Sequence, residues 1–126
     1  MDKSWKNKNF FIALKNAFNG IKFVLKNERN LKIQVFFAIV AIFISGFLKI
    51  NLIEWAIIVL TIFIVFLTEI FNTAIENVTD MITLEYNEKA KIVKDISAGA
   101  VVLTSIASII IGGLIFLPKI LKIIKI

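Results

Sequence analysis

The sequence predicts an all-α integral membrane protein, in which an N-terminal amphipathic surface helix precedes three transmembrane helices. In this 126-residue chain 59% of the residues are hydrophobic and the mean hydropathy is +0.89, which exceeds the range of soluble domains. Three long apolar runs account for the excess. The lysines lie beside these runs, so the net charge of +6 indicates attraction to a membrane surface and no nucleic-acid partner.

The chain contains neither cysteine nor histidine. Disulfides, thiolate chemistry, the commonest general base and the commonest zinc ligand are therefore all excluded. Any acid–base or metal chemistry must use carboxylates, and carboxylates with amides suit a hard ion such as Mg²⁺.

The first predicted element is a surface helix within residues 1–30. From Phe10 to Lys26, apolar side chains dominate one face and lysine and asparagine side chains the other. A basic amphipathic helix of this kind lies in the plane of the membrane interface. Its role is either that of a simple anchor or that of a roof over an active site.

Three apolar runs follow the surface helix and predict the transmembrane helices. They are Ile33–Leu48, Trp55–Thr68 and Ile96–Leu117, and with their flanks they predict helices at about 31–50, 53–80 and 92–117. A tight turn is expected at Lys49, and Pro118 is expected to close the last helix. We interpret residues 1–126 as one domain.

The distribution of basic residues predicts the orientation. Residues 1–32 and 80–95 hold 11 of the 15 lysines and arginines, while Lys49 and residues 119–125 hold the other four. By the positive-inside bias, the N-terminus and the 80–95 segment lie in the cytoplasm. We therefore expect a multi-pass protein of the cell membrane.

The second span continues into an acidic face. Glu69, Asn72, Glu76 and Asp80 fall within an arc of about 80° on one helix. Because the preceding apolar run is shorter than a bilayer, these acids begin within the membrane or at its edge. Ionisable groups cost at least about 2.5–3.5 kcal/mol each near the bilayer centre and less near the interface, and they usually mark function. The alternative is a helix that has left the membrane and carries a solvated acidic face.

Residues alone leave the chemistry of this face open. Carboxylates facing Lys94 across the cytoplasmic edge suit phosphoryl transfer, which needs a metal, a cation and a base. They equally suit a small oligomeric ion channel or a proton relay. No phosphate-binding loop or protein-kinase signature occurs in the sequence.

A resemblance to a known family favours phosphoryl transfer. The pattern Glu69-x-x-Asn72-Thr-Ala-Ile-Glu76-x-x-x-Asp80, then Glu85-Tyr86, then Lys94-Asp95-x-x-Ala-Gly-Ala-Val, resembles the prokaryotic diacylglycerol kinase family of small three-span lipid kinases. The match runs from Phe18 to Pro118. Two further segments, Glu28–Ile33 and Ile115–Lys119, are similar to the Gram-positive branch, whose members phosphorylate undecaprenol.

The resemblance implies a homotrimeric helical bundle with its active site on the cytoplasmic side, using ATP as co-substrate and Mg²⁺ as cofactor. It implies that Glu69 is the catalytic base, that Glu28 and Glu76 bind the metal, and that Asn72 and Asp80 are further polar residues of the site. The implied nucleotide contacts are Glu85, Tyr86, Asn87, Lys94 and Asp95. Asn87 and Gln34 stand where relatives often carry histidine, so neither can titrate near pH 7.

The expected function is ATP-dependent phosphorylation of a membrane lipid hydroxyl, with undecaprenol as substrate and diacylglycerol as the alternative. Diacylglycerol brings ester carbonyls that need donors, and the lipid side offers few besides Asn16, Asn19 and Gln34. A polyprenol needs only apolar contact. The sequence therefore favours undecaprenol.

Overall fold

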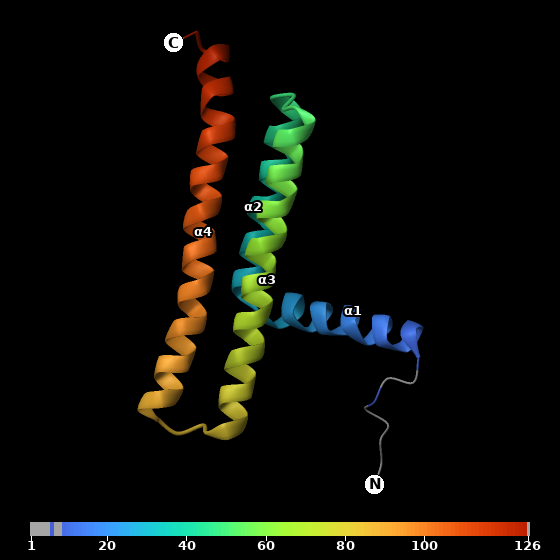
Figure 1. Ribbon diagram of the computed structural model, residues 1–126, viewed down its shortest axis with the longest axis vertical. Coiled ribbons are helices and arrows are strands. Elements are labelled where there is room, and N and C mark those ends of the chain that lie inside the picture. The colour runs from blue at the N-terminus through green and yellow to red at the C-terminus, as the bar shows by residue number, and fades with distance from the viewer. Residues whose placement is uncertain (1–5, 7–8, 126) are drawn as a thin grey trace.

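The computed structural model describes residue 6 and residues 9–125, and within them it forms four helices (Figure 1). The first predicted element begins at residue 1, so its start lies outside the described residues. Helix α1 spans Phe10–Asn27, with Asn9 as its N-cap, whose side chain accepts a hydrogen bond from the Ile12 amide. Glu28, in an extended conformation, separates α1 from α2, which spans Arg29–Phe47. This one-residue break lets α1 run crosswise to the bundle, as Figure 1 shows.

Helix α3 spans Leu52–Ile82 and is set by a capping box at its first turn. The Asn51 side chain accepts a hydrogen bond from the backbone N–H of Glu54. The Glu54 carboxylate in turn accepts one from the backbone N–H of Asn51. The expected tight turn precedes it, with Lys49 in the left-handed region at φ 52°. These two features reverse the chain so that α3 packs antiparallel to α2.

Helix α4 spans Glu88–Ile123 and is longer than expected at both ends. It begins at Glu88, because the Asn87 side chain caps it by accepting from the Ala90 amide. It also continues through Pro118, where the sequence predicted its end. Proline removes one backbone donor, but membrane helices tolerate that loss. Lys119, in the next turn, is held by an ion pair with Glu54 at 3.1 Å.

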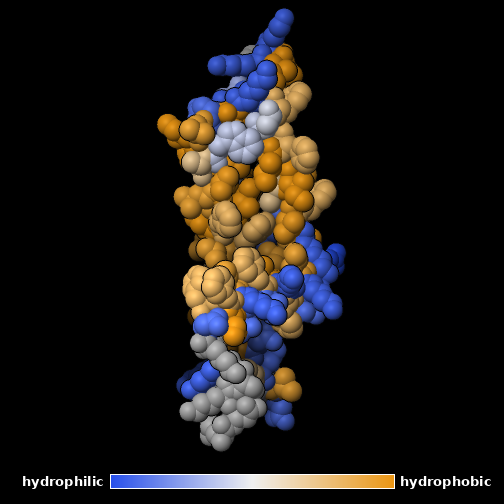
Figure 2. Space-filling view, turned by 90° about the vertical axis from the view of Figure 1, so that its right-hand side faces the viewer, coloured by the Kyte–Doolittle hydropathy of each residue, from blue (hydrophilic) through white to orange (hydrophobic). Residues whose placement is uncertain are grey.

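The three long helices have the length and composition of membrane spans. On the face shown in Figure 2 a broad hydrophobic band crosses the bundle, with hydrophilic side chains at the end that carries the C-terminus and again toward the opposite end. Most large apolar side chains are exposed on the single chain, as expected where lipid is the solvent. The protein is therefore a multi-pass membrane protein, as predicted.

The lengths of the three long helices can be compared with the thickness of the hydrocarbon layer of a membrane. The 19 residues of α2 span about 28 Å, close to the hydrocarbon thickness of about 30 Å. Helices α3 and α4, with 31 and 36 residues, span about 46 and 54 Å. Their connected ends project past the level of α1 (Figure 1). The α3–α4 pair thus carries a two-helix extension beyond the membrane on the side of α1.

The apolar core lies near the other end of the bundle. Ile50, Ile58 and Ile115 are buried together there, where the α2–α3 turn meets α4. Toward α1 the interior becomes polar, since the buried side chains on α3 include Glu69, Asn72, Thr73 and Thr79. A Thr68–Thr104 hydrogen bond of 2.9 Å joins α3 to α4 between the two regions.

Candidate active site

The acidic face of α3 is turned into the bundle where α1 joins α2. Glu69 is only 1% exposed, and Asn72 and Thr73 are also buried. A buried carboxylate is costly unless it is paired or protonated. A solvated face on a helix that has left the membrane would show these residues exposed. The structure therefore rules out that alternative for this part of α3, whereas Asp80, nearly three turns further on, is exposed.

Side chains from two other segments surround the Glu69 carboxylate. The side-chain amides of Asn30 and Gln34 on α2 approach it, and the charges of Glu28 and Glu76 act on it. Among the described residues, however, neither Glu69 oxygen has a partner with hydrogen-bonding geometry. The break between α1 and α2 positions Glu28 here, because it places that carboxylate just before Asn30. Glu69 thus lies within electrostatic reach of two other acids.

Several acceptor atoms around this point have no donor. Besides both Glu69 oxygens, Oε1 of Gln34 and Oδ1 of Asn72 are buried without a partner. Each unpaired buried polar atom costs about 1–3 kcal/mol. A cluster of acceptors without donors has the composition of a site that holds a proton or a cation.

The carboxylate and amide oxygens around Glu69 are the type of ligand that suits Mg²⁺ bound together with a nucleotide. In the described part of the chain, no three acidic side chains lie close enough to hold a metal alone. Mg²⁺ is usually bound by one or two carboxylates, with phosphate oxygens and water completing six positions. Glu28 and Glu76, whose charges both act on Glu69, are the two carboxylates that could meet that need, and Asn72 orients Glu76 by donating a 3.2 Å hydrogen bond to its Oε1.

A second group of charged residues lies on the projecting ends of α3 and α4. We call the group of Glu28, Glu69 and Glu76 the first tier and this group the second tier. Lys94 pairs with Asp80 at 2.7 Å across the two helices, so the lysine does lie opposite the acidic face. Asp95 pairs instead with Lys91, at 2.6 Å. All four side chains are largely exposed. Exposed pairs contribute little stability, so an incoming phosphate can replace either carboxylate.

The α3–α4 connection carries the remaining predicted residues. The backbone N–H of Glu85 donates a hydrogen bond to the Thr83 hydroxyl at 3.2 Å, which holds the backbone of Glu85 in the turn. Tyr86 is 82% exposed. Asn87 uses its side-chain oxygen to cap α4, which leaves its amide nitrogen for a ligand. These three side chains stand beyond the membrane at the level of the second tier.

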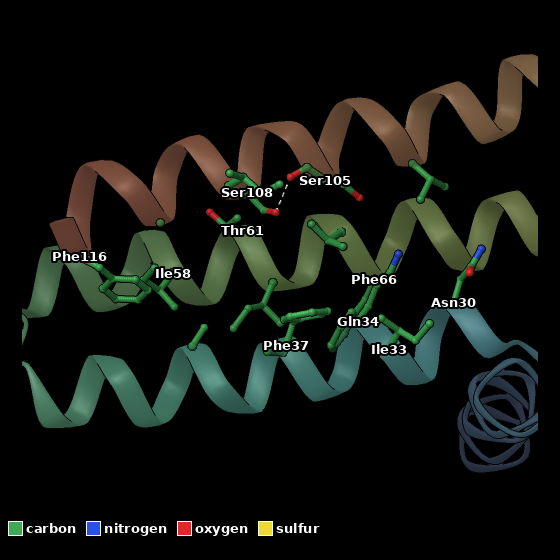
Figure 3. Close-up of a pocket in the computed structure, with 17 residues that line it drawn as sticks. Asn30, Ile33, Gln34, Phe37, Ile58, Thr61, Phe66, Ser105, Ser108 and Phe116 are labelled. Atoms are coloured by element: carbon green, nitrogen blue, oxygen red, sulfur yellow. Dashed lines mark hydrogen bonds between the residues drawn. The ribbon is translucent and has the colours of Figure 1, made fainter.

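A groove of about 530 Å³ runs from Glu69's neighbours into the membrane between α2, α3 and α4. Figure 3 shows Asn30 and Gln34 at one end, Thr61 and Ser108 at its middle and Phe116 at the other end. Ser97, Ser105, Ser108 and Gly112 are small residues on one side of α4. Ser97 is buried, but Ser105, Ser108 and Gly112 line this groove.

Asn30 was not anticipated as a site residue, and Gln34 was considered as a donor to lipid and as a replacement for histidine, but not as a neighbour of Glu69. The signal was present, because two amide side chains four residues apart lie on one helix face. What the sequence did not show is that this face meets α3 at Glu69.

Comparisons with known proteins place the chain among membrane lipid kinases. A family model described as prokaryotic diacylglycerol kinase matches residues 15–116. The chain is 44% identical over 111 residues to a Bacillus subtilis protein named undecaprenol kinase, covering 87% of this chain and 89% of that protein. It is 36% identical over 115 residues to a Synechocystis protein named diacylglycerol kinase, covering 90% of this chain and 66% of that protein, just under two thirds. The Escherichia coli K12 diacylglycerol kinase is 28% identical over 94 residues, covering 75% and 77%.

Proposed function

This chain belongs to the prokaryotic diacylglycerol kinase family, and on that premise we propose that it transfers the γ-phosphoryl group of ATP to undecaprenol. The alternative acceptor is the hydroxyl of diacylglycerol. Both reactions make the same bond. The lipid hydroxyl oxygen attacks the γ-phosphorus, the bond to the β-phosphate oxygen breaks, and the hydroxyl proton leaves.

The observation that carries the proposal is the placement of Glu69. It lies 15 residues beyond Glu54 on α3, about 22 Å along the helix, in a hydrocarbon layer of about 30 Å. Glu69 is therefore about one and a half turns below the surface, a depth that a lipid hydroxyl reaches and a free nucleotide does not. Its unpaired oxygens are free to accept the hydroxyl proton, which is the role of a general base.

We assign the metal site to the first tier and the nucleotide site to the second tier. Glu28 and Glu76 would hold Mg²⁺, which when bound neutralises charge on the phosphate oxygens. Asn72 keeps the Glu76 carboxylate in position through its hydrogen bond. In the second tier Lys94 exchanges Asp80 for a phosphate oxygen.

The other nucleotide contacts are proposed on the same basis. Asp95, Glu85, Tyr86 and the free amide of Asn87 surround the projecting end of α3 and α4, where solvent has access. A nucleotide bound there can extend its phosphates down toward Glu76 and Glu28.

The preference for undecaprenol rests on the polar groups available to the lipid. Gln34 and Asn30 both approach Glu69, so these amides face the proposed catalytic carboxylate and not the ester carbonyls of a diacylglycerol. Exposed aromatic side chains on α1, at Phe10, Phe11 and Phe18, offer apolar contact to a long chain. The 44% identity to a protein named undecaprenol kinase supports the same choice.

We further propose a homotrimer in the cell membrane with its active site in the cytoplasm. The groove is open to the membrane on the single chain, and its small residues Ser105, Ser108 and Gly112 permit close approach of another helix. The extension that carries the second tier lies on the side of α1 (Figure 1). That side holds most of the lysines, as the positive-inside bias requires of a cytoplasmic face.

The test is phosphate transfer by the purified chain with Mg·ATP and either lipid in the same mixed micelle. We expect phosphorylation of both, with a higher kcat/KM for undecaprenol. Equal or better kcat/KM for diacylglycerol would reverse the substrate assignment. No transfer to any lipid, with ion leak from liposomes that carry the protein, would instead support a channel.

A further inference from the structure

The end of the bundle opposite the proposed active site carries a cluster of lysines that phosphoryl transfer does not use. Three elements contribute to it, namely the α2–α3 turn with Lys49, the last turns of α4 with Lys119 and Lys122, and Lys125 directly after α4. In Figure 2 hydrophilic side chains gather at this end, above the hydrophobic band. We call these four residues the distal lysine cluster.

The ion pair of Glu54 with Lys119 joins the parts of the cluster. Glu54 stands in the first turn of α3, three residues after Asn51, and holds Lys119 on α4 at 3.1 Å. Lys49 is two residues before Asn51, on the turn whose Ile50 packs against Ile115. The turn and the end of α4 are thus one packed unit.

Among the described residues, one charge of the cluster has an acidic partner. Glu54 is the only acid among the described residues at this end, and it pairs with Lys119. Lys49, Lys122 and Lys125 are exposed, and none has an ion-pair partner in the part of the chain that the structure describes. Three unit charges therefore face outward together.

The apolar surroundings of the cluster indicate what it meets. Phe47, Leu52, Ile53, Ile120, Ile123 and Ile124 are exposed at the same end. Such side chains partition into the acyl boundary, while lysine ammonium groups extend to the headgroups. The mixture of exposed isoleucines and lysines suits a bilayer surface, not a soluble partner. Because α4 continues through Pro118, Lys119 and Lys122 stay in this layer on one helix.

We propose that the distal lysine cluster binds the anionic headgroups of phospholipids in the leaflet opposite the proposed active site. The cluster runs against the positive-inside bias, and anionic lipid supplies the countercharge that the chain lacks there. Each lysine near an anionic surface favours anionic over neutral lipid about fivefold, from about 1 kcal/mol at 1.4 kcal/mol per tenfold. The local bilayer around this end is then enriched in anionic lipid.

Trp55 provides a local reporter for the test. It packs against the buried core beside the cluster, and Trp5 is the only other tryptophan of the chain. In a Trp5→Phe background, the full chain is reconstituted into phosphatidylcholine vesicles that contain a fixed fraction of brominated phosphatidylglycerol or brominated phosphatidylcholine. Bromine quenches Trp55 when the labelled lipid lies beside it.

We expect stronger quenching by the brominated anionic lipid, corresponding to at least a fivefold local preference that declines as salt is raised. Lys49→Gln/Lys122→Gln/Lys125→Gln should abolish the preference while lipid kinase activity is unchanged. The matched control removes three lysines from α1, Lys15→Gln/Lys22→Gln/Lys26→Gln, and should leave the Trp55 preference intact.

Three results would overturn the proposal. These are equal quenching by the two lipids in the parent protein, a preference that survives in the distal variant, and loss of the preference on adding millimolar inorganic phosphate. The last result would mean that the cluster binds a free anion. None of these readouts depends on the identity of the phosphorylated lipid.

Discussion

Replacing Glu69 by glutamine should separate catalysis from folding, because the two depend on this side chain in opposite ways. Glutamine keeps the shape of glutamate but cannot accept the hydroxyl proton. A positioned general base contributes about 10²–10⁴-fold in rate, so we expect kcat to fall by that factor. This corresponds to about 3–5 kcal/mol in the activation barrier.

The free energy of unfolding of the Glu69→Gln variant should not fall as its kcat does. Glu69 is 1% exposed, its oxygens have no donor, and the charges of Glu28 and Glu76 act on it. A glutamine amide removes that repulsion, and its N–H can donate to the unpaired Oε1 of Gln34. A new hydrogen bond contributes about 1 kcal/mol net, so the free energy of unfolding should stay equal or rise by about that amount.

The assay combines phosphate transfer to lipid in mixed micelles with unfolding followed by circular dichroism in the same detergent. Glu88→Gln makes the same chemical change at an exposed position in the first turn of α4, and should leave kcat within about threefold. A Glu69→Gln variant with near-parental kcat would refute the assignment of the base. A variant that loses activity only because it unfolds more easily would refute the account of the buried charge.

Two further predictions concern the metal and the nucleotide. Glu28→Ala and Glu76→Ala should each raise the Mg²⁺ concentration for half-maximal activity at least tenfold, because each removes one carboxylate from the metal; an unchanged Mg²⁺ titration in both would place the metal elsewhere. Asn87→Ala should lower the free energy of unfolding by about 1 kcal/mol through loss of the α4 cap, whereas Asn87→Asp should not. Both Asn87 variants should raise the KM for ATP, since both lose the side-chain amide, and an unchanged KM would leave Asn87 as a cap alone.

Local patterns in the sequence were sufficient for the elements and for part of the site. Hydropathy identified all three spans, and the helical period placed Glu69, Asn72 and Glu76 on one face. Both properties are determined by residues within a few turns of one another. Helix ends were less well predicted. The start of α4 depends on the Asn87 cap, and its continuation past Pro118 accompanies a contact with Glu54, which lies 65 residues earlier in the chain than Lys119.

By itself, the sequence determined that this is a three-span membrane protein. It also predicted an acidic face on the second span, with Lys94 opposite the end of that face that carries Asp80. Only the tertiary structure decided that Asn30 and Gln34 meet Glu69, and that the small residues of α4 line a groove. The physical reason is that hydropathy distinguishes buried from exposed faces only in water. In a bilayer the lipid is as apolar as a neighbouring helix, so the choice of which faces meet is made by turns, caps and long-range packing.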